Sequence, residues 1–328
     1  MQITAAAAGL GATAWGLGRL RVPGRWNRHE ESRLLMGTIV NLTVLTPDER
    51  GGRDAIAAAF ERMEELESLL SRFRPNSELS HLNKNGSLRP ADPNLISVVR
   101  RAQEYARLTD GSFDISVEPL LAAYRRSAEN GERLTADEVE QVRARIDYQA
   151  VEVDELGIAF MHEGMAINLD GIAKGYVIDR GADALRTLGF SEILVEAGGD
   201  MMGLSGEQHP WRAGVKSPRP HDGAEYLGVV TLAQSALATS GDYLHSFTQD
   251  YRQHHIVDPR SGVSPAELAS TSVVAPSAMD ADALSTALMV LGPRQGLQLV
   301  ERLAGVEALL VDKQMGVHRS TGFKLEAA

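Results

Sequence analysis

The stretch Ala278-Met-Asp-Ala-Asp-Ala-Leu-Ser-Thr-Ala-Leu-Met-Val-Leu291 carries the strongest structural signal in this chain. It follows the β-branched run Thr271-Ser-Val-Val-Ala275, which is typical of a strand. The apolar residues in the stretch recur at helical spacing and predict a helix over 280–291. Asp282 and Thr286 are four residues apart, so on that helix they share one face.

These two side chains are hard oxygen ligands. Mg²⁺ prefers such ligands and usually keeps other positions for waters and substrate phosphates. The pair therefore predicts a magnesium site for a phosphorylated ligand. A second interpretation stays open at this point, because an Asp in the first helical turn often caps the helix and a Thr at this spacing often packs or bonds back to it.

Length and composition set the broad class. The chain has 328 residues, of which 43% are hydrophobic and 23% charged, enough for one large domain or two small ones. The formal net charge of −11 argues against nucleic-acid binding, which needs a basic surface. The chain has no cysteine, which excludes disulfides, a thiolate zinc site, a cysteine nucleophile and a lipid-bearing N-terminal cysteine.

Residues 1–33 are expected to be a leader that precedes the folded unit. Their apolar, Ala- and Gly-rich part has about the length of an export signal and is too short to be a persuasive membrane span. The basic segment that opens an export signal is missing, so we expect a truncated signal, of twin-arginine type, and a periplasmic or otherwise exported protein. The alternative is an Ala/Gly-rich tail on a cytoplasmic protein.

The rest, roughly 34–325, is expected to form one α+β domain with mixed β-sheets and flanking helices. Strands and helices alternate irregularly, and many expected strands are close in sequence. The expected strands are 36–45, 192–196, 212–216, 226–232, 271–275 and 308–311, with a hairpin between 151–160 and 165–169. The expected helices are 54–72, 94–108, one starting at Thr135, 171–188, 280–291 and 294–304.

Several short motifs punctuate these elements. Asp170-Gly-Ile-Ala-Lys174 opens a helix whose first N–H groups, with Lys174, suit a phosphate. Ala197-Gly-Gly-Asp200 follows a strand, and a tight turn is its simplest interpretation. His255 precedes the turn Asp258-Pro-Arg-Ser-Gly262, where a histidine is suited to act as a general base or to make a structural hydrogen bond.

Taken in order, the motifs give the chain a resemblance to the ApbE family, the FAD:protein FMN transferases, over about 36–325. The matching blocks are Met36-Gly-Thr38, Ser71-Arg-Phe-Arg-Pro-Asn-Ser-Glu-Leu-Ser80, Gly111-Ser-Phe-Asp114, Leu169-Asp-Gly-Ile-Ala-Lys-Gly-Tyr-Val-Ile-Asp179, Ala197-Gly-Gly-Asp200, Ala238-Thr-Ser-Gly-Asp242, His255-Ile-Val-Asp-Pro259 and Asp282-Ala-Leu-Ser-Thr286.

The resemblance implies an enzyme that binds FAD and Mg²⁺. It would move FMN from FAD to a Ser or Thr hydroxyl of an acceptor flavoprotein, forming a phosphoester and releasing AMP. It implies that Asp282, Thr286 and the backbone carbonyl of Gly171 bind Mg²⁺. The residues implied for FAD are Met36, Phe73, Ser112, Phe113, Asp114, Lys174, Val177 and Val257.

For catalysis, the resemblance makes His255 the first candidate for the general base. It also counts Asp282, as a metal ligand, among the catalytic residues. Asp242 or a group of the acceptor is the second. The acceptors it implies are subunits of membrane redox complexes. Two other functions stay open: a Mg²⁺-dependent FAD pyrophosphatase, in which water replaces the acceptor, and a non-catalytic FAD-binding accessory protein of a respiratory complex.

Overall fold

The computed structural model describes residues 26–47, 51–206, 210–221 and 224–327. Residues 1–25 of the expected leader lie outside the described residues. The folded unit nevertheless begins earlier than expected, because residues from Asn27 onward belong to the first strand, β1 (Asn27–Leu35). Exposed residues alternate with half-buried ones along this edge strand, and charged side chains occur at both kinds of position, which explains why the sequence of this segment does not look like part of a core.

An eight-stranded sheet forms the centre of the molecule, and all its described strand pairs are antiparallel. The α+β fold expected from the sequence is confirmed. In spatial order the strands are β1, β2 (Thr38–Thr46), β6 (Glu192–Ala197), β7 (Asp200–Leu204), β10 (Gln234–Gly241), β11 (Leu268–Ala275), β12 (Glu307–Asp312) and β13 (Val317–Arg319).

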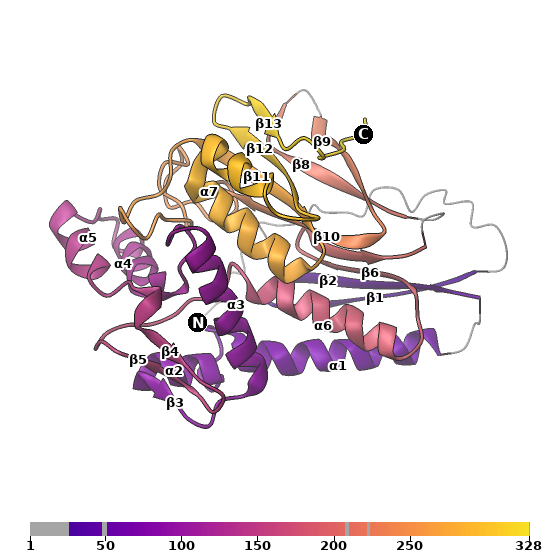
Figure 1. The fold of residues 1–328 in the computed structure, drawn as a ribbon, viewed down its shortest axis with the longest axis horizontal. Helices are drawn as coiled ribbons and strands as arrows, with labels where there is room; N and C mark the ends of the chain where they lie inside the picture. The colour runs from indigo at the N-terminus through magenta and orange to yellow at the C-terminus, as the bar shows by residue number, and fades with distance from the viewer. Residues whose placement is uncertain (1–25, 48–50, 207–209, 222–223, 328) are drawn as a thin grey trace.

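Each face of this sheet is covered by different elements. Helices α1 (Gly52–Leu70), α6 (Ala173–Thr187) and α7 (Ala278–Val300) pack against one face (Figure 1). The ribbon of β8 (Trp211–His221) and β9 (Ala224–Leu232) packs against the other. Strand alternation produces both layers, because successive side chains point to opposite faces. In β6, Ile193 and Val195 join the helical core while Leu194 joins the core under the ribbon.

Smaller elements gather at one end of the sheet, on the left in Figure 1. They are α2 (Glu78–Asn85), β3 (Ser87–Leu88), α3 (Pro93–Leu108), the 3₁₀ turns η1 (Ile115–Val117) and η2 (Tyr148–Ala150), α4 (Glu118–Glu129), α5 (Ala136–Arg143), β4 (Val151–Val153) and β5 (Ile158–Phe160). Thr135, where the sequence predicts a helix start, forms a capping box with Glu138 at the beginning of α5.

Three local expectations were wrong. The hairpin pairs β4 with β5, and residues 165–169 are not a strand. The reason is Asp154, whose Oδ1 accepts the backbone N–H groups of Leu156 and Gly157 and closes a tight turn within the run. The strand expected from 36 begins at Thr38, because Met36 and Gly37 have φ values of 53° and 72° and form the β1–β2 turn. The break at Gly292 separates two helical segments as expected, but the second segment ends at Val300 rather than at residue 304.

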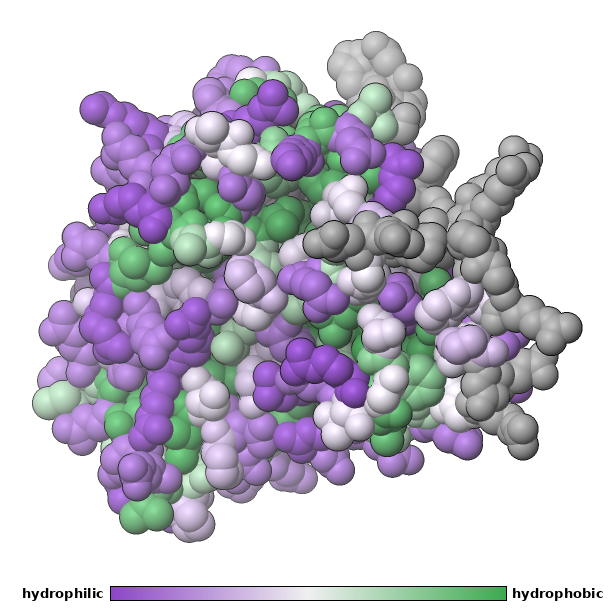
Figure 2. Space-filling model, turned by 45° about the vertical axis from the view of Figure 1, so that its right-hand side comes forward, coloured by the Kyte–Doolittle hydropathy of each residue, from purple (hydrophilic) through white to green (hydrophobic). Residues whose placement is uncertain are grey.

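No helix in the described part of the chain is long and apolar enough to cross a membrane. On the face shown in Figure 2, hydrophilic side chains predominate and hydrophobic ones form small, scattered groups. That surface shows no broad apolar area of the kind that marks a large hydrophobic interface.

Candidate active site

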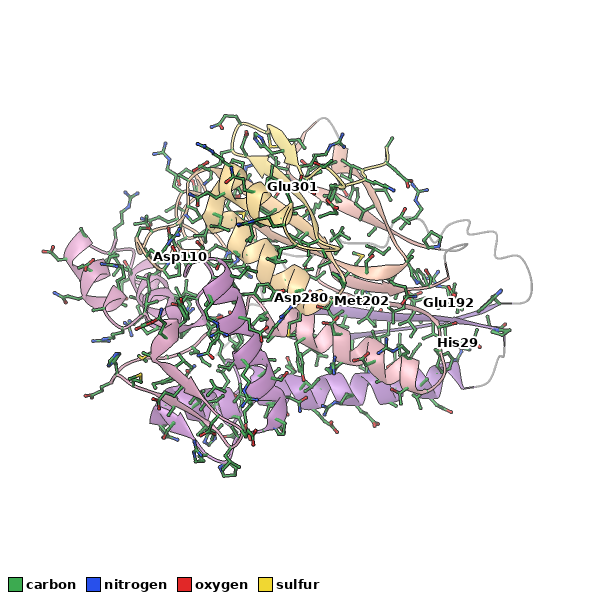
Figure 3. The ribbon with its side chains drawn as sticks, viewed as in Figure 1. His29, Asp110, Glu192, Met202, Asp280 and Glu301 are labelled. Carbon is green, nitrogen blue, oxygen red and sulfur yellow. The ribbon has the colours of Figure 1, made fainter. Side chains whose placement is uncertain are left out.

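The N-terminal turn of α7 is fixed by two groups that are not ligand candidates. The hydroxyl of Ser277 caps the helix by accepting the N–H of Asp280 at 3.1 Å. Asp280, labelled in Figure 3, points toward α3 and pairs with Arg101 at 2.8 Å. Asp282 follows two positions later and is directed into the interior instead, with 4% of its surface exposed. The helix therefore separates a surface carboxylate from a buried one.

The start of α6 lies directly against this buried carboxylate. The N–H of Gly175 donates to Asp282 Oδ2 at 3.0 Å. A side chain at position 175 would place its Cβ 2.2 Å from the carbonyl oxygen of Ala278, so only glycine allows the two helices to meet here. The Gly-Ile-Ala-Lys-Gly motif thus serves to bring the two helix starts together.

Gly171 brings the third candidate ligand to the same place. A Cβ at this position would lie 2.9 Å from Thr286 Oγ1 and 3.5 Å from the ring of Phe113. Thr286 Oγ1 is also 3.2 Å from Ser240 Oγ. Gly171, which is distant from Asp282 and Thr286 in the sequence, therefore lies beside the face of α7 that carries them, and the three groups border one small volume.

Charges around this volume are not balanced. Burial raises the pKa of Asp282 to about 7; the charge of Asp200 adds to the shift, and Lys174 opposes it. Lys174 forms an ion pair with Asp200 at 2.7 Å. Burial alone would lower the pKa of Lys174, but the carboxylates of Asp200 and Asp282 outweigh it and raise that pKa, so Lys174 is charged. Since this one cation faces two buried carboxylates, a further cation fits the site.

The donor chemistry fits Mg²⁺. In the described residues no group of three or more His, Cys, Asp or Glu side chains is arranged to hold a metal ion. A carboxylate, a hydroxyl and a backbone carbonyl are instead the mixed oxygen donors that Mg²⁺ accepts while keeping waters or phosphate oxygens. Asp282, Thr286 and Gly171 would provide them.

The Ser112-Phe113-Asp114 segment lies beside Gly171 but is mostly buried. Phe113 packs edge-on against Tyr105, with ring centroids 6.3 Å apart. Asp114 caps η1 by accepting the N–H of Ser116 at 2.7 Å. The buried hydroxyl of Ser112 has no hydrogen-bond partner among the described residues. It is therefore the polar group of this segment that a ligand would satisfy.

Met36 and Phe73 both lie near the C-terminal end of α1. The N–H of Met36 donates to Glu67 Oε1 at 2.7 Å, which fixes the β1–β2 turn to α1. Phe73 is 73% exposed, and the guanidinium of Arg72 lies 3.9 Å from its ring centroid. An exposed ring already stacked on a cation is suited to stack on a flavin or adenine ring.

Val177 and Val257 have buried side chains. Val177 belongs to the main core, and Val257 packs with Leu120, Leu121 and Tyr124 beneath α4. Any contact of these two residues with FAD would therefore be made by their backbone atoms.

His255 is held in one orientation. Its Nδ1 lies 3.2 Å from the carbonyl oxygen of His245, which can only accept, so Nδ1 carries the proton and Nε2 keeps its lone pair. Burial lowers the pKa of His255 to about 3, and the neighbouring rings of His245 and His254 and the charge of Lys174 add to the shift. The imidazole is therefore neutral near pH 7 and within electrostatic range of Lys174.

A second charged cluster was missed in the sequence. Asp242 has no exposed surface, and its carboxylate accepts two hydrogen bonds from Arg219 at 2.8 and 2.9 Å. Lys313 Nζ lies 3.4 Å away and donates to the carbonyl of Tyr251. Both cations come from other elements of the fold, so no local sequence spacing predicts that they pair with Asp242. A carboxylate engaged in this way is not available as the general base, so His255 and a group of the acceptor stay as candidates.

Known proteins are similar to this chain in sequence and in fold. The sequence model of the ApbE family matches residues 36–310. The FAD:protein FMN transferase of Vibrio cholerae serotype O1 is 30% identical over 276 residues, which cover 81% of this chain and 82% of that protein. The FAD:protein FMN transferase of Treponema pallidum is 26% identical over 332 residues, which cover 94% of this chain and 91% of that protein.

Solved structures agree. The ApbE protein of Thermotoga maritima superposes with a TM-score of 0.80 at 29% identity, covering 90% of this chain and 97% of that one. The apo flavinyl transferase ApbE of Pseudomonas stutzeri gives 0.78 at 27% identity, covering 90% and 94%. Fold and relatives together define an enzyme of the transferase class. The chain belongs to the ApbE family.

Proposed function

We propose that this protein is a Mg²⁺-dependent FAD:protein FMN transferase that moves FMN from FAD to a Ser or Thr hydroxyl of an acceptor protein. The observation that carries the proposal is the meeting of Asp282, Thr286 and Gly171 beside Lys174, with one cation facing two buried carboxylates. The family membership and the names of the relatives support the same reaction.

The chain's own groups have distinct tasks in this reaction. Lys174 holds a positive charge next to the FAD phosphates, and Ser112 and Phe73 contact the nucleotide. His255 Nε2 takes the proton of the acceptor hydroxyl, whose oxygen then bonds to the phosphorus of the FMN unit. The bond from that phosphorus to the AMP phosphate breaks, and AMP leaves. When bound, Mg²⁺ supplies the charge that stabilises the phosphate oxygens during transfer.

The orientation of His255 favours transfer to a hydroxyl. Because Nδ1 is occupied by the carbonyl of His245, Nε2 is the ring atom left to accept a proton. The imidazole is already neutral at pH 7, so no deprotonation has to precede the reaction.

The proposal extends to location and partner. The apolar leader expected from the sequence supports export to the periplasm, and the acceptor would then be a flavoprotein subunit of a membrane redox complex. Mapping the mature N-terminus in the native host tests this part. An intact Met1 on cytoplasmic protein would contradict export.

The direct test is a transfer assay. The full chain is incubated with FAD, Mg²⁺ and a fragment bearing a Ser/Thr flavinylation motif, and acceptor mass and released AMP are measured. We expect a mass gain of one FMN that EDTA abolishes. AMP without labelled acceptor would identify a pyrophosphatase instead. If neither AMP nor labelled acceptor formed, the enzymatic proposal would be contradicted.

A further inference from the structure

Residues of α2 and α4 line a hollow of about 370 Å³. Both helices lie at the left-hand end of the molecule in Figure 1. Its wall includes Arg72, Ser80, Asn83, Glu118, Arg126 and Arg145. We propose that this hollow is the docking site for an acidic segment of the acceptor protein. The inference rests on the proposed transferase function and adds the chemistry by which the acceptor is recognised.

The inner wall of the hollow connects to the candidate metal site through direct contacts. Arg72 pairs with Asp170 at 2.7 Å, and Asp170 immediately precedes Gly171. Asn168 donates to Glu118 at 2.7 Å. An acceptor segment bound in the hollow would therefore lie next to the loop in which Gly171 approaches Thr286.

The outer wall carries two arginines that have no ion pair among the described residues, Arg126 and Arg145. Their neighbours do have partners, because Arg125 pairs with Glu118 and Arg143 with Glu140 at 2.7 Å. The one acidic side chain of the wall, Glu118, is thus already engaged. What the hollow offers to a partner is unneutralised positive charge.

Arg145 lies across a glycine at the wall. A Cβ at Gly164 would lie 3.2 Å from Arg145 Cδ and 3.3 Å from its Nε, so the side chain runs over Gly164, which also lines the hollow. Arginine also offers the planar donor pair that matches a carboxylate.

Charge complementarity selects an acidic occupant. The chain has a formal net charge of −11, so its surface as a whole repels an acidic protein. Two arginines at the wall of the hollow that have no ion pair among the described residues would attract an acidic segment there and orient it. The size of the hollow is at the lower end of the roughly 300–1,000 Å³ usual for ligand pockets, which suits a few side chains better than a whole dinucleotide.

The test measures binding and transfer separately. The probe is a soluble acceptor fragment bearing the Ser/Thr motif, and its dissociation constant for the full chain is measured by fluorescence anisotropy without FAD. We expect the double variant Arg126→Glu/Arg145→Glu to weaken binding roughly tenfold, since two attractions become repulsions. Arg133→Glu is the matched control, because Arg133 is also exposed and does not line the hollow.

A charge exchange makes the test specific. Changing the acidic residues nearest the acceptor hydroxyl to Lys should weaken binding to the wild type and restore binding to the double variant. In the transfer assay the double variant should raise the KM for the acceptor about tenfold. Unchanged acceptor binding overturns the docking inference, and so does a raised KM for FAD alone, which would assign the hollow to the nucleotide. Normal acceptor binding without any FMN transfer by the wild type would count against the proposed function only.

Discussion

Two buried aspartates of this protein differ in whether the chain's own cations neutralise their charge. Asp242 is fully buried and is neutralised by the chain's own Arg219 and Lys313. Asp282 is buried almost as completely, at 4% exposed, and receives only one backbone N–H, from Gly175. In the described residues no basic side chain forms an ion pair with it. A buried carboxylate with its own cations serves the fold, whereas one without them is prepared for a cation from outside.

The largest expected effect is the loss of activity when Asp282 is changed. In Asp282→Asn we expect FMN transfer to become undetectable and FAD binding to weaken. Loss of groups that merely orient metal ligands costs about 10–100-fold, and loss of a ligand itself exceeds that. Stability should be kept, because a neutral amide replaces a poorly compensated buried charge.

Acceptor mass, flavin fluorescence and a thermal melt measure these three outcomes. Asp280→Asn is the matched control on the same helical turn, because Asp280 pairs with Arg101 outside the site. Full transfer by Asp282→Asn in Mg²⁺ buffer would remove the contrast between the two aspartates.

The next effect separates chemistry from binding. His255→Ala should keep its affinity for FAD, while the single-turnover rate of transfer falls by about 10²–10⁴-fold, the usual contribution of a general base. Wild-type transfer should show no loss from protonation of His255 between pH 5 and 8, because burial lowers its pKa to about 3. Rapid-quench measurement of AMP tests both. An unchanged rate would move the base to the acceptor, because Asp242 is held by its two cations.

Asp242→Asn, unlike Asp282→Asn, should lower the free energy of unfolding. It leaves two cations facing a neutral group, and breaking a buried ion pair costs about 3–5 kcal/mol. Because Arg219 and Lys313 are partly exposed, we expect the lower end, about 3 kcal/mol. Urea unfolding measures it, with the exposed Asp250→Asn as a control that should change stability by less than about 0.5 kcal/mol. A stable Asp242→Asn protein would show that this cluster is not structural.

The sequence predicted most of what depends on local pattern. Helical spacing identified α1, α3 and α6, and paired glycines identified the Gly198-Gly199 turn. The position of Asp282 and Thr286 on one face of α7 follows from their spacing alone. These features are visible because the residues that decide them are neighbours in sequence.

What the sequence missed depends on distant residues. The partners of Asp242 come from β8 and from the loop after β12, so no window contains the cluster. β1 was placed in the leader because its exposed edge carries charges, and only pairing with β2 makes it a strand. The edge-on contact of Phe113 with Tyr105, which buries the Phe113 ring, also joins two segments that no local pattern connects.

The smallest effect is a pH dependence of stability near the Asp242 cluster. His254 is fully buried, and burial lowers its pKa to about 4 from the usual 6.5. Below pH 6.5 the unfolded chain binds a proton at this position that the folded chain does not, so this group's contribution to stability falls as pH falls from 6.5 toward 4. At pH 5 the loss is on the order of 1–2 kcal/mol relative to pH 7.5. His254→Gln keeps a donor for the carbonyl of Pro265 and removes the titration. Urea midpoints at both pH values should therefore differ less in the variant than in the wild type, and an equal difference would mean that other groups set the acid sensitivity of this cluster.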